Sequence, residues 1–335
     1  MKKFLAITLA IFSVFSLTLL SGCAENAELK MGMGVYSYYD TVRNAEADSD
    51  GNVEMAQTVA AVLVDKDGKI VACDIDSVVA TGNFTSSGKF ISAEEFKSKD
   101  ELGDNYGMVA YGKAKKEWYA QADAFCSLAI GKTLDEVKAL EASGGKGNDD
   151  VISAGCTITV SDFVKAIEKA VNTATACNAG KKDTVKIGIV AAQTVSDCKD
   201  ATADADGVCV VDSAFSAVAL KGDKVTAMLS DALTAKFTFD VKGVSTTKTD
   251  AEIVTKKDAG ANYGMSKYGT DLNKDGTVKE WFEQADAFNA ACVGKTADEI
   301  SALAINGYGV DSLQSAGCTI AISDMVKAAV KAATI

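Results

Sequence analysis

The chain has no histidine and no proline, and Arg43 is its only arginine. The missing histidine excludes a Ser-His-Asp triad, histidine-ligated haem and the usual histidine-bearing zinc sites. The missing proline leaves Gly, Asp and Asn to make the turns. Because the net charge is −12 and arginine is nearly absent, we expect the chain to bind neither nucleic acid nor anionic lipid headgroups.

Residues 1–22 have the pattern of a lipoprotein signal peptide. A positively charged start precedes an apolar run over Phe4–Leu20, and LSGC follows at 20–23. The pattern predicts cleavage before Cys23, lipidation of Cys23 and a tether over residues 23–27; an uncleaved membrane anchor is the alternative. We therefore expect a body held at the extracellular face of the cell membrane by acyl chains.

The rest of the chain has the signature of one domain copied once. We predict repeat 1 over residues 28–174, a linker over 175–183 and repeat 2 over 184–335. Five marks recur in the same order: LKMGMGVYS at 29–37 and VKIGIVAAQ at 185–193, DSDG at 48–51 and DADG at 204–207, NYGM at 105–108 and 262–265, KEWYAQADAF at 116–125 and KEWFEQADAF at 279–288, and SAGCT at 153–157 and 315–319.

Each repeat is expected to place strands before helices, which predicts an α+β fold with an antiparallel sheet. β-Rich runs flank turn signals at DKDG 65–68 and at KGDK 221–224. The apolar residues of each KEW stretch share one helix face. The predicted strands are Thr58–Val64, Ile70–Ile75, Phe215–Leu220 and Val225–Leu229, and the helix-face residues are Trp118, Ala122, Phe125 and Ala129, then Trp281, Ala285, Phe288 and Cys292.

Helix starts are signalled at two places in each repeat. The GKT stretches lack the first glycine of a phosphate-binding loop, because Cys126 and Asn289 stand there. Thr133 with Glu136, and Thr296 with Glu299, have the spacing of capping boxes instead. The helix after each SAGCT is expected to take its serine, Ser161 or Ser323, as the N-cap.

Acidic turns raise the question of calcium. DLNKDGTV at 271–278 has the start of an EF-hand loop, with Asp271, Asn273, Asp275 and Gly276, but Phe282 stands where the bidentate glutamate belongs. Solvated Asp-Gly turns explain this stretch and the two D-x-D-G stretches without a metal. A third hypothesis, that the chain is a calcium-dependent adhesin, is supported by these incomplete loops alone.

Eight cysteines remain besides Cys23, and no C-x-x-C occurs. The absence of a C-x-x-C motif argues against a thioredoxin-type pair or an iron–sulfur site. Cys198 and Cys209 flank an Asp-rich turn, and the sequence leaves open whether they are bridged or free. The others are expected to be free thiols if the habitat is poor in oxygen.

The matched aromatic residues have two interpretations. Trp118 and Trp281 are core residues on their helix faces, or they form a wall against a planar ligand. In NYGM, a tyrosine beside a glycine lets a ring and a bare backbone approach a ligand together, whereas the alternative is a turn with a tyrosine plug. The candidate ligand contacts are Tyr106, Met108, Tyr263 and Met265.

The stretches DVISAGCTITVSDFVKAIEKA and DSLQSAGCTIAISDMVKAAVKA resemble the covalent flavin motif of FMN-binding domains. That motif ends in a Thr or Ser that carries FMN through a phosphoester bond, made by a flavin transferase with FAD as donor. The resemblance implies Thr157 and Thr319 as the attachment sites of two covalent FMN cofactors. The small residues before each threonine suit this role, since they leave room for a second enzyme to approach.

Over most of its length the chain is similar to exported flavoprotein lipoproteins of Gram-positive extracellular electron transfer. The resemblance implies an electron carrier rather than a substrate-specific enzyme. Electrons would pass from a membrane NADH dehydrogenase and quinone pool to the FMN groups, then to ferric iron, flavins or another extracellular acceptor. The alternative is a cofactor-free tandem-domain surface lipoprotein that binds a small molecule or a partner.

Overall fold

The computed structural model describes residues 29–93, 95–250, 253–268 and 278–334. The predicted signal peptide with Cys23, and the EF-hand-like residues Asp271, Asn273, Asp275 and Gly276, lie outside these ranges. No helix within the described ranges combines the length and the apolar character that crossing a bilayer requires.

The first half of the chain forms an antiparallel sheet with the strand order β4-β3-β2-β1-β5. The predicted turn at 65–68 is confirmed, because Gly68 (φ 76°) lies in the connection between β2 and β3, which pair with each other in this sheet. The strands run well beyond the predicted segments. They are β1 Lys30–Arg43, β2 Gly51–Val64, β3 Ile70–Phe84, β4 Phe90–Ile91 and β5 Thr175–Ala176.

The second half forms an antiparallel sheet with the order β6-β7-β8. Gly222 (φ 64°) begins the tight turn between β7 and β8, where KGDK predicted one. The strands are β6 Thr184–Gln193, β7 Gly207–Lys221 and β8 Lys224–Phe239. Mixed helices and antiparallel sheets confirm the α+β class.

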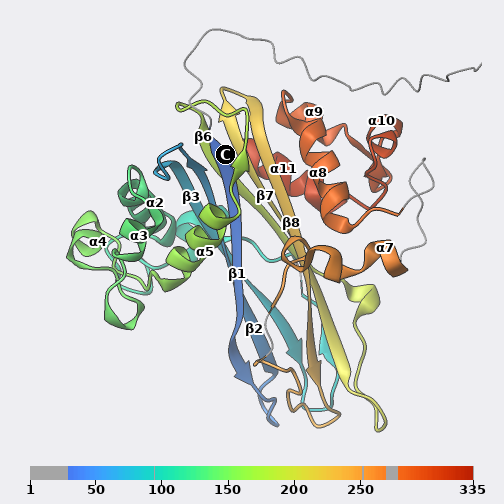
Figure 1. Cartoon of the computed structure of the whole chain (residues 1–335). Coiled ribbons are helices and arrows are strands. Elements are labelled where there is room, and N and C mark those ends of the chain that lie inside the picture. The colour runs from blue at the N-terminus through green and yellow to red at the C-terminus, as the bar shows by residue number, and fades with distance from the viewer. Residues whose placement is uncertain (1–28, 94, 251–252, 269–277, 335) are drawn as a thin grey trace, which may run out of the picture.

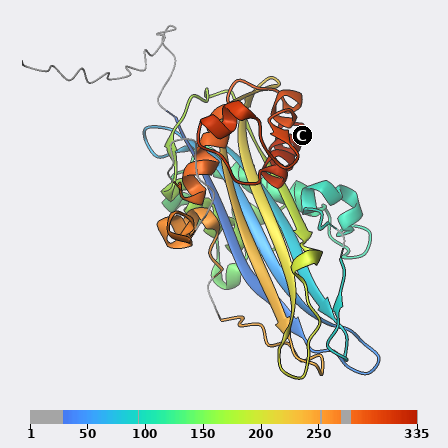
Figure 2. The ribbon, with the colours of Figure 1, turned by 90° about the vertical axis from the view of Figure 1, so that its right-hand side faces the viewer.

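The two sheets face each other (Figures 1 and 2), and side chains from both sheets form one apolar core. The rings of Phe84 on β3 and Phe239 on β8 stack with centroids 4.6 Å apart and planes 9° from parallel. Tyr39 on β1 meets Phe237 on β8 edge to face. Such pairs add about 0.5–1.5 kcal/mol each to the burial of the rings. The halves are therefore joined through their strands.

Helices cover the outer face of each sheet, so the layers run helix, sheet, sheet, helix (Figure 1). On the first sheet lie α2 (Trp118–Ala129) and α5 (Ser161–Asn172). On the second lie α8 (Trp281–Cys292) and α11 (Ser323–Thr334). The buried residues of α2 and α8 include all the residues predicted for their inward faces.

Short elements connect these layers. In the first half they are α1 Lys99–Leu102, η1 Gly103–Tyr106, α3 Leu134–Lys138, η2 Ser143–Gly145 and α4 Asp149–Ala154. In the second half they are η3 Val195–Asp197, α6 Lys256–Ala259, η4 Gly260–Tyr263, α7 Met265–Tyr268, α9 Ala297–Ser301, β9 Ala304–Ile305, β10 Tyr308–Gly309 and α10 Asp311–Ser315.

The helix-start predictions have mixed outcomes. Both capping boxes are confirmed, because Thr133 caps α3 and Thr296 caps α9, each with its glutamate reaching back. The serine N-caps are wrong by one residue: α5 begins at Ser161 and α11 at Ser323. Val160 is the N-cap of α5, and it has no side-chain capping bond because its side chain is apolar and buried.

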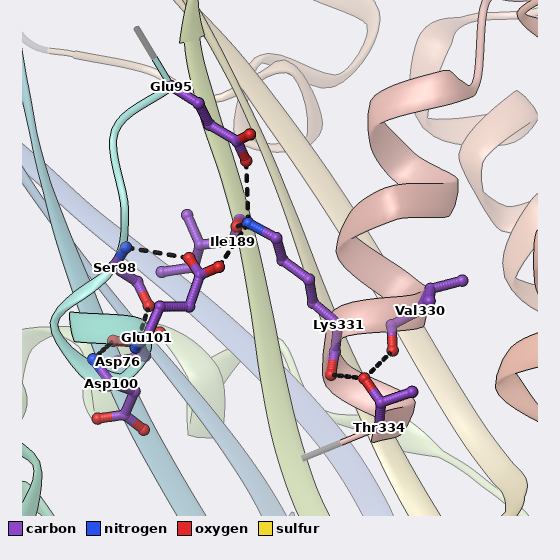
Figure 3. Close-up of polar contacts among 9 residues, drawn as sticks. All are labelled: Asp76, Glu95, Ser98, Asp100, Glu101, Ile189, Val330, Lys331 and Thr334. Carbon is purple, nitrogen blue, oxygen red and sulfur yellow. Dashed lines mark hydrogen bonds and ion pairs between the residues drawn. The ribbon is translucent and has the colours of Figure 1, made fainter. Parts of the chain in front are cut away.

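A polar junction joins the last helix to the first half (Figure 3). The ammonium group of Lys331 on α11 lies 2.8 Å from Glu101 and 3.0 Å from Glu95, and it donates to the carbonyl of Ile189. Glu101 also closes the capping box of α1 with Ser98. The C-terminal helix therefore fixes the position of α1, which carries a residue of the site described next.

Candidate functional site

Thr157 is held by a buried glutamine on the neighbouring helix. The side-chain oxygen of Gln121 accepts hydrogen bonds from the backbone N–H of Thr157 at 2.8 Å and from its hydroxyl at 3.1 Å. Thr319 and Gln284 make the same two bonds at the same distances. Both glutamines are 1% exposed, whereas Thr157 is exposed and Thr319 half-buried. Each predicted threonine therefore has a fixed backbone and an oriented, reachable hydroxyl.

The other end of each glutamine links the threonine to the NYGM stretch. The amide nitrogen of Gln121 donates to the carbonyl of Lys116 at 3.0 Å and lies 4.0 Å from the sulfur of Met108. The structure thus brings the predicted residues Met108 and Thr157 together through a residue that the sequence analysis missed. In the second half, the amide nitrogen of Gln284 donates to the carbonyl of Lys279 at 3.1 Å and lies 3.3 Å from the sulfur of Met265.

A lysine ammonium group lies against the glycine of each SAGCT turn. Gly155 (φ 97°) ends α4, and a Cβ added there would lie 2.5 Å from Nζ of Lys116. Lys116 also donates to the carbonyl of Ala154 at 3.1 Å. A Cβ added to Gly317 (φ 100°) would lie 2.1 Å from Nζ of Lys279. Each threonine is therefore preceded by a turn that only glycine suits, with a cation over it.

The cysteines before the threonines are packing residues. Cys156 and Cys318 are fully buried. Burial raises the pKa of each thiol to about 11, so both thiols stay protonated near neutral pH. They contribute to the apolar clusters beneath the helices.

A buried glutamate fixes each NYGM stretch. The carboxylate of Glu117 accepts hydrogen bonds from the backbone N–H groups of Met108 and Val109, at 2.8 and 2.9 Å. Glu280 does the same for Met265 and Ser266. In each NYGM stretch, the asparagine and tyrosine end a 3₁₀ helix and the glycine after them is left-handed. The turn leaves its tyrosine ring about two-fifths exposed, at 39% for Tyr106 and 41% for Tyr263.

A lysine, a tyrosine and a tryptophan meet in each half. The ammonium group of Lys99 lies 5.4 Å from the ring centre of Tyr106 and 5.0 Å from that of Trp118. Burial lowers the pKa of Lys99, and the carboxylates of Asp162, Asp76 and Asp40 oppose that shift. In the second half, the ammonium group of Lys256 lies 5.6 Å from the ring centre of Tyr263 and 5.9 Å from that of Trp281. The sequence analysis missed both lysines.

Buried aspartates position these lysines. Asp76 on β3 accepts a hydrogen bond from the backbone N–H of Asp100 at 3.1 Å, at the start of α1 (Figure 3). Asp231 on β8 accepts one from the backbone N–H of Lys257 at 3.0 Å, at the start of α6. Burial raises the pKa of both carboxyl groups to about 6. Each aspartate thus anchors the turn of helix that carries Lys99 or Lys256.

A cavity lies between these residues and the outer face of each sheet. The first has a volume of 380 Å³, and its walls include Lys99, Tyr106, Met108, Trp118, Ile158 and Thr159. The second has 240 Å³, and its walls include Lys256, Trp281, Ala321, Ser323, Asp324 and Met325. The first volume lies within the range of small-molecule sites, and the second is slightly below it. Trp118 and Trp281 are 4% exposed, so each is a core residue, and each also borders its cavity.

The predicted contacts are not equally placed. Tyr106 and Met108 both line the first cavity; Thr157 is not among its lining residues, but the next two residues, Ile158 and Thr159, are. Tyr263 instead lines a separate cavity of 610 Å³ beside Tyr39 and Lys236, and Lys256 borders both this cavity and the one at Trp281. Met265 reaches the second site through its contact with Gln284.

Comparisons of the chain with protein-family models, with curated proteins and with solved structures find no match.

Proposed function

We propose that this chain is a membrane-anchored extracellular flavoprotein electron carrier. Residues 28–174 and 184–335 would be two copies of one FMN-binding-like domain, with FMN attached to Thr157 and Thr319 by phosphoester bonds. The FMN groups supply electron transfer, relaying electrons from a membrane NADH dehydrogenase and quinone pool to extracellular acceptors such as ferric iron or flavins. The chain itself acts as a carrier rather than as a substrate-specific enzyme.

The observation that carries this proposal is the shared arrangement around the two threonines. In each half a buried glutamine orients the hydroxyl, a left-handed glycine shapes the turn, and a lysine ammonium group lies over that glycine. A residue that only filled space would not need an oriented hydroxyl in both places. The arrangement suits a hydroxyl that forms a phosphoester.

The residues around Thr157 fit an attached phosphate. A phosphomonoester linked to a protein carries negative charge, and an ammonium group within a few ångströms offsets it. Lys116 and Lys279 are the cations nearest the glycine turns, and the missing Cβ of Gly155 or Gly317 is what lets the ammonium group approach. These lysines would hold the phosphate, while each glutamine keeps the backbone of its threonine fixed.

The cavity walls fit a planar ring. Trp118 and Tyr106 offer aromatic surface, and Lys99 offers a positive charge beside it. Aromatic walls of this kind favour stacking of a flat ring. Lys256 and Trp281 would do the same in the second half.

A flavin transferase is the partner that this proposal requires, because the motif that the SAGCT stretches resemble is modified by such an enzyme. Thr157 is exposed and lies in the loop between α4 and α5. An enzyme can therefore reach it without unfolding either helix. Thr319 lies in the corresponding loop between α10 and α11.

Co-expression with a flavin transferase tests the proposal. The purified lipoprotein should be yellow and should keep its colour after denaturation and gel filtration. The variants Thr157→Val and Thr319→Val should each keep about half of the bound flavin, and the double variant should be colourless. A wild-type chain that is colourless after denaturation would leave the cofactor-free surface lipoprotein as the better account.

A further inference from the structure

Cys198 and Cys209 are neighbours, and each adjoins one residue of an antiparallel bridge. Lys199 and Val208 exchange both backbone hydrogen bonds, at 2.9 and 2.8 Å, in an antiparallel bridge. Cys198 and Cys209 are the next residues along from this isolated bridge, one on each segment. In antiparallel pairing, the position next to a hydrogen-bonded pair is a non-hydrogen-bonded one, with both side chains on the same face.

This pairing has the geometry that a disulfide needs. Residues in a non-hydrogen-bonded antiparallel pair have Cα atoms about 4.5 Å apart, within the roughly 4.4–6.8 Å range of natural disulfides. Both side chains belong to the core between the sheets, with Cys198 7% and Cys209 0% exposed. Burial, with the Cys198 thiol beside it, raises the pKa of Cys209 to about 12. The two buried thiols therefore lie close enough for the bond to be proposed.

All eight described cysteines are free thiols in this structure, and two other pairs are neighbours. Cys126 on α2 contacts Cys73 on β3, and Cys318 lies near Cys292 on α8. Each of these pairs joins a helix to a strand or a loop, so no ladder aligns the two side chains. They are the rival pairs that a test must separate.

We infer that Cys198 and Cys209 are a disulfide site, oxidised as the exported chain folds. The bond would close the loop 198–209. Within that loop, Asp200 accepts a hydrogen bond from the backbone N–H of Phe90 at 3.0 Å, and the backbone N–H of Ala201 donates to the carbonyl of Gly88 at 2.7 Å. Closing this loop therefore fixes the surface on which the β3–β4 hairpin of the first half docks.

The chemistry is thiol–disulfide exchange with an external disulfide, supplied by an oxidised oxidoreductase or by oxidised glutathione. One cysteine thiolate attacks the external disulfide, forming a mixed disulfide and releasing one thiol. The second cysteine thiolate attacks the mixed disulfide, forming the Cys198–Cys209 bond and releasing the other thiol. Two protons and two electrons leave the chain and are found on the two released thiols. Because burial disfavours the thiolates, the folded reduced protein should react slowly, and the bond should form during folding.

Alkylation in denaturant tests the inference on the full chain. Cells that export the lipoprotein are lysed directly into denaturant with N-ethylmaleimide, and the protein is digested with trypsin without reduction. Because trypsin cuts after Lys199, a bridge joins peptide 187–199 to peptide 200–221. We expect this linked species, lighter by two hydrogen atoms than its parts, with the other six cysteines alkylated.

Two variants make the outcome decisive. Cys73→Ser with Cys126→Ser should keep the linked peptides, and Cys198→Ser with Cys209→Ser should lose them. Dithiothreitol should lower the Tm of the wild type by several degrees and leave the Tm of the second variant unchanged. Alkylation of all eight cysteines in the wild type, or a link at Cys73–Cys126 or Cys292–Cys318 instead, would overturn the inference. Neither result bears on the flavin sites, which are assayed by colour and adduct mass.

Discussion

The side-chain oxygen of Gln121 accepts two hydrogen bonds from Thr157, one from the backbone and one from the hydroxyl. Gln284 accepts the same two hydrogen bonds from Thr319. The separation along the chain is 36 residues between Gln121 and Thr157 and 35 residues between Gln284 and Thr319. In each half the glutamine comes from a long helix and the threonine from the loop before the next helix. The helix thus controls the direction of one hydroxyl in a loop.

The glutamine should matter for attachment. Gln121→Leu removes the acceptor of the Thr157 hydroxyl and should slow flavin attachment at Thr157 about tenfold, the equivalent of roughly one hydrogen bond. Time-resolved peptide mass spectrometry during co-expression with the transferase measures this rate. Thr319 in the same molecule is the internal control and should be unaffected. Equal rates at both threonines would remove the glutamine from the account.

The lysine over each turn should hold the attached phosphate. Lys116→Met should reduce flavin occupancy at Thr157, because an ammonium group no longer offsets the phosphate charge. Lys115→Met is the matched control, since Lys115 is the neighbouring exposed lysine. Peptide occupancy at Thr157 is the readout. If both variants lower occupancy equally, net charge rather than position explains the effect.

Gly155→Ala should destabilise the chain through backbone strain and displace the ammonium group of Lys116. A left-handed backbone strains alanine by about 1–3 kcal/mol. The new Cβ would meet Nζ of Lys116, which is the free end of a flexible, exposed side chain and can move aside. Gly131→Ala is the control for strain alone, because Gly131 (φ 83°) has open space around it. Urea unfolding should show a similar loss of stability for both variants, and a much larger loss for Gly155→Ala would contradict this.

Stability should rise as the pH falls from 8 to 5.5. Burial raises the pKa of Asp76 to about 6 and, with the carboxylates of Asp76 and Asp74 beside it, that of Asp100 to about 8. The folded chain then binds more protons than the unfolded chain between these values and about pH 4, so the free energy of unfolding decreases as the pH rises through that window.

Asp100→Asn checks this pH dependence. One carboxylate oxygen of Asp100 is buried without a hydrogen-bond partner, so removing its charge should raise stability at pH 8 by roughly 1–2 kcal/mol. The slope of stability against pH should become shallower. Urea unfolding at pH 5.5, 7 and 8 measures both. A variant that is less stable than the wild type at pH 8 would contradict the sign.

Much of the fold could be predicted from local signals. The capping boxes at Thr133 and Thr296 and the turn at Gly68 depend on a few neighbouring residues, and the structure confirms them. The packing of one sheet on the other could not be predicted in the same way. Gly51–Val64 is buried on nearly every residue, which reflects contacts on both faces that a local pattern does not reveal.

The site was only partly predictable. Both threonines and the NYGM stretches stood out because they recur, but Gln121 lies on the buried face of α2 beside Ala122 and was passed over. The signal for it was a polar side chain inside an apolar stripe, three residues after Trp118. Lys99 and Lys116 look like ordinary surface lysines, since only the folded chain brings them beside Trp118 and Gly155.

The central claim is tested most directly by the masses of two peptides. The protein is isolated from cells that contain a flavin transferase, denatured, digested, and analysed for the peptides that contain Thr157 and Thr319. The account predicts that each peptide carries the mass of one FMN less one water, on the threonine and on no other residue. Unmodified threonines in both peptides, from cells in which the transferase modifies a known substrate, would contradict it.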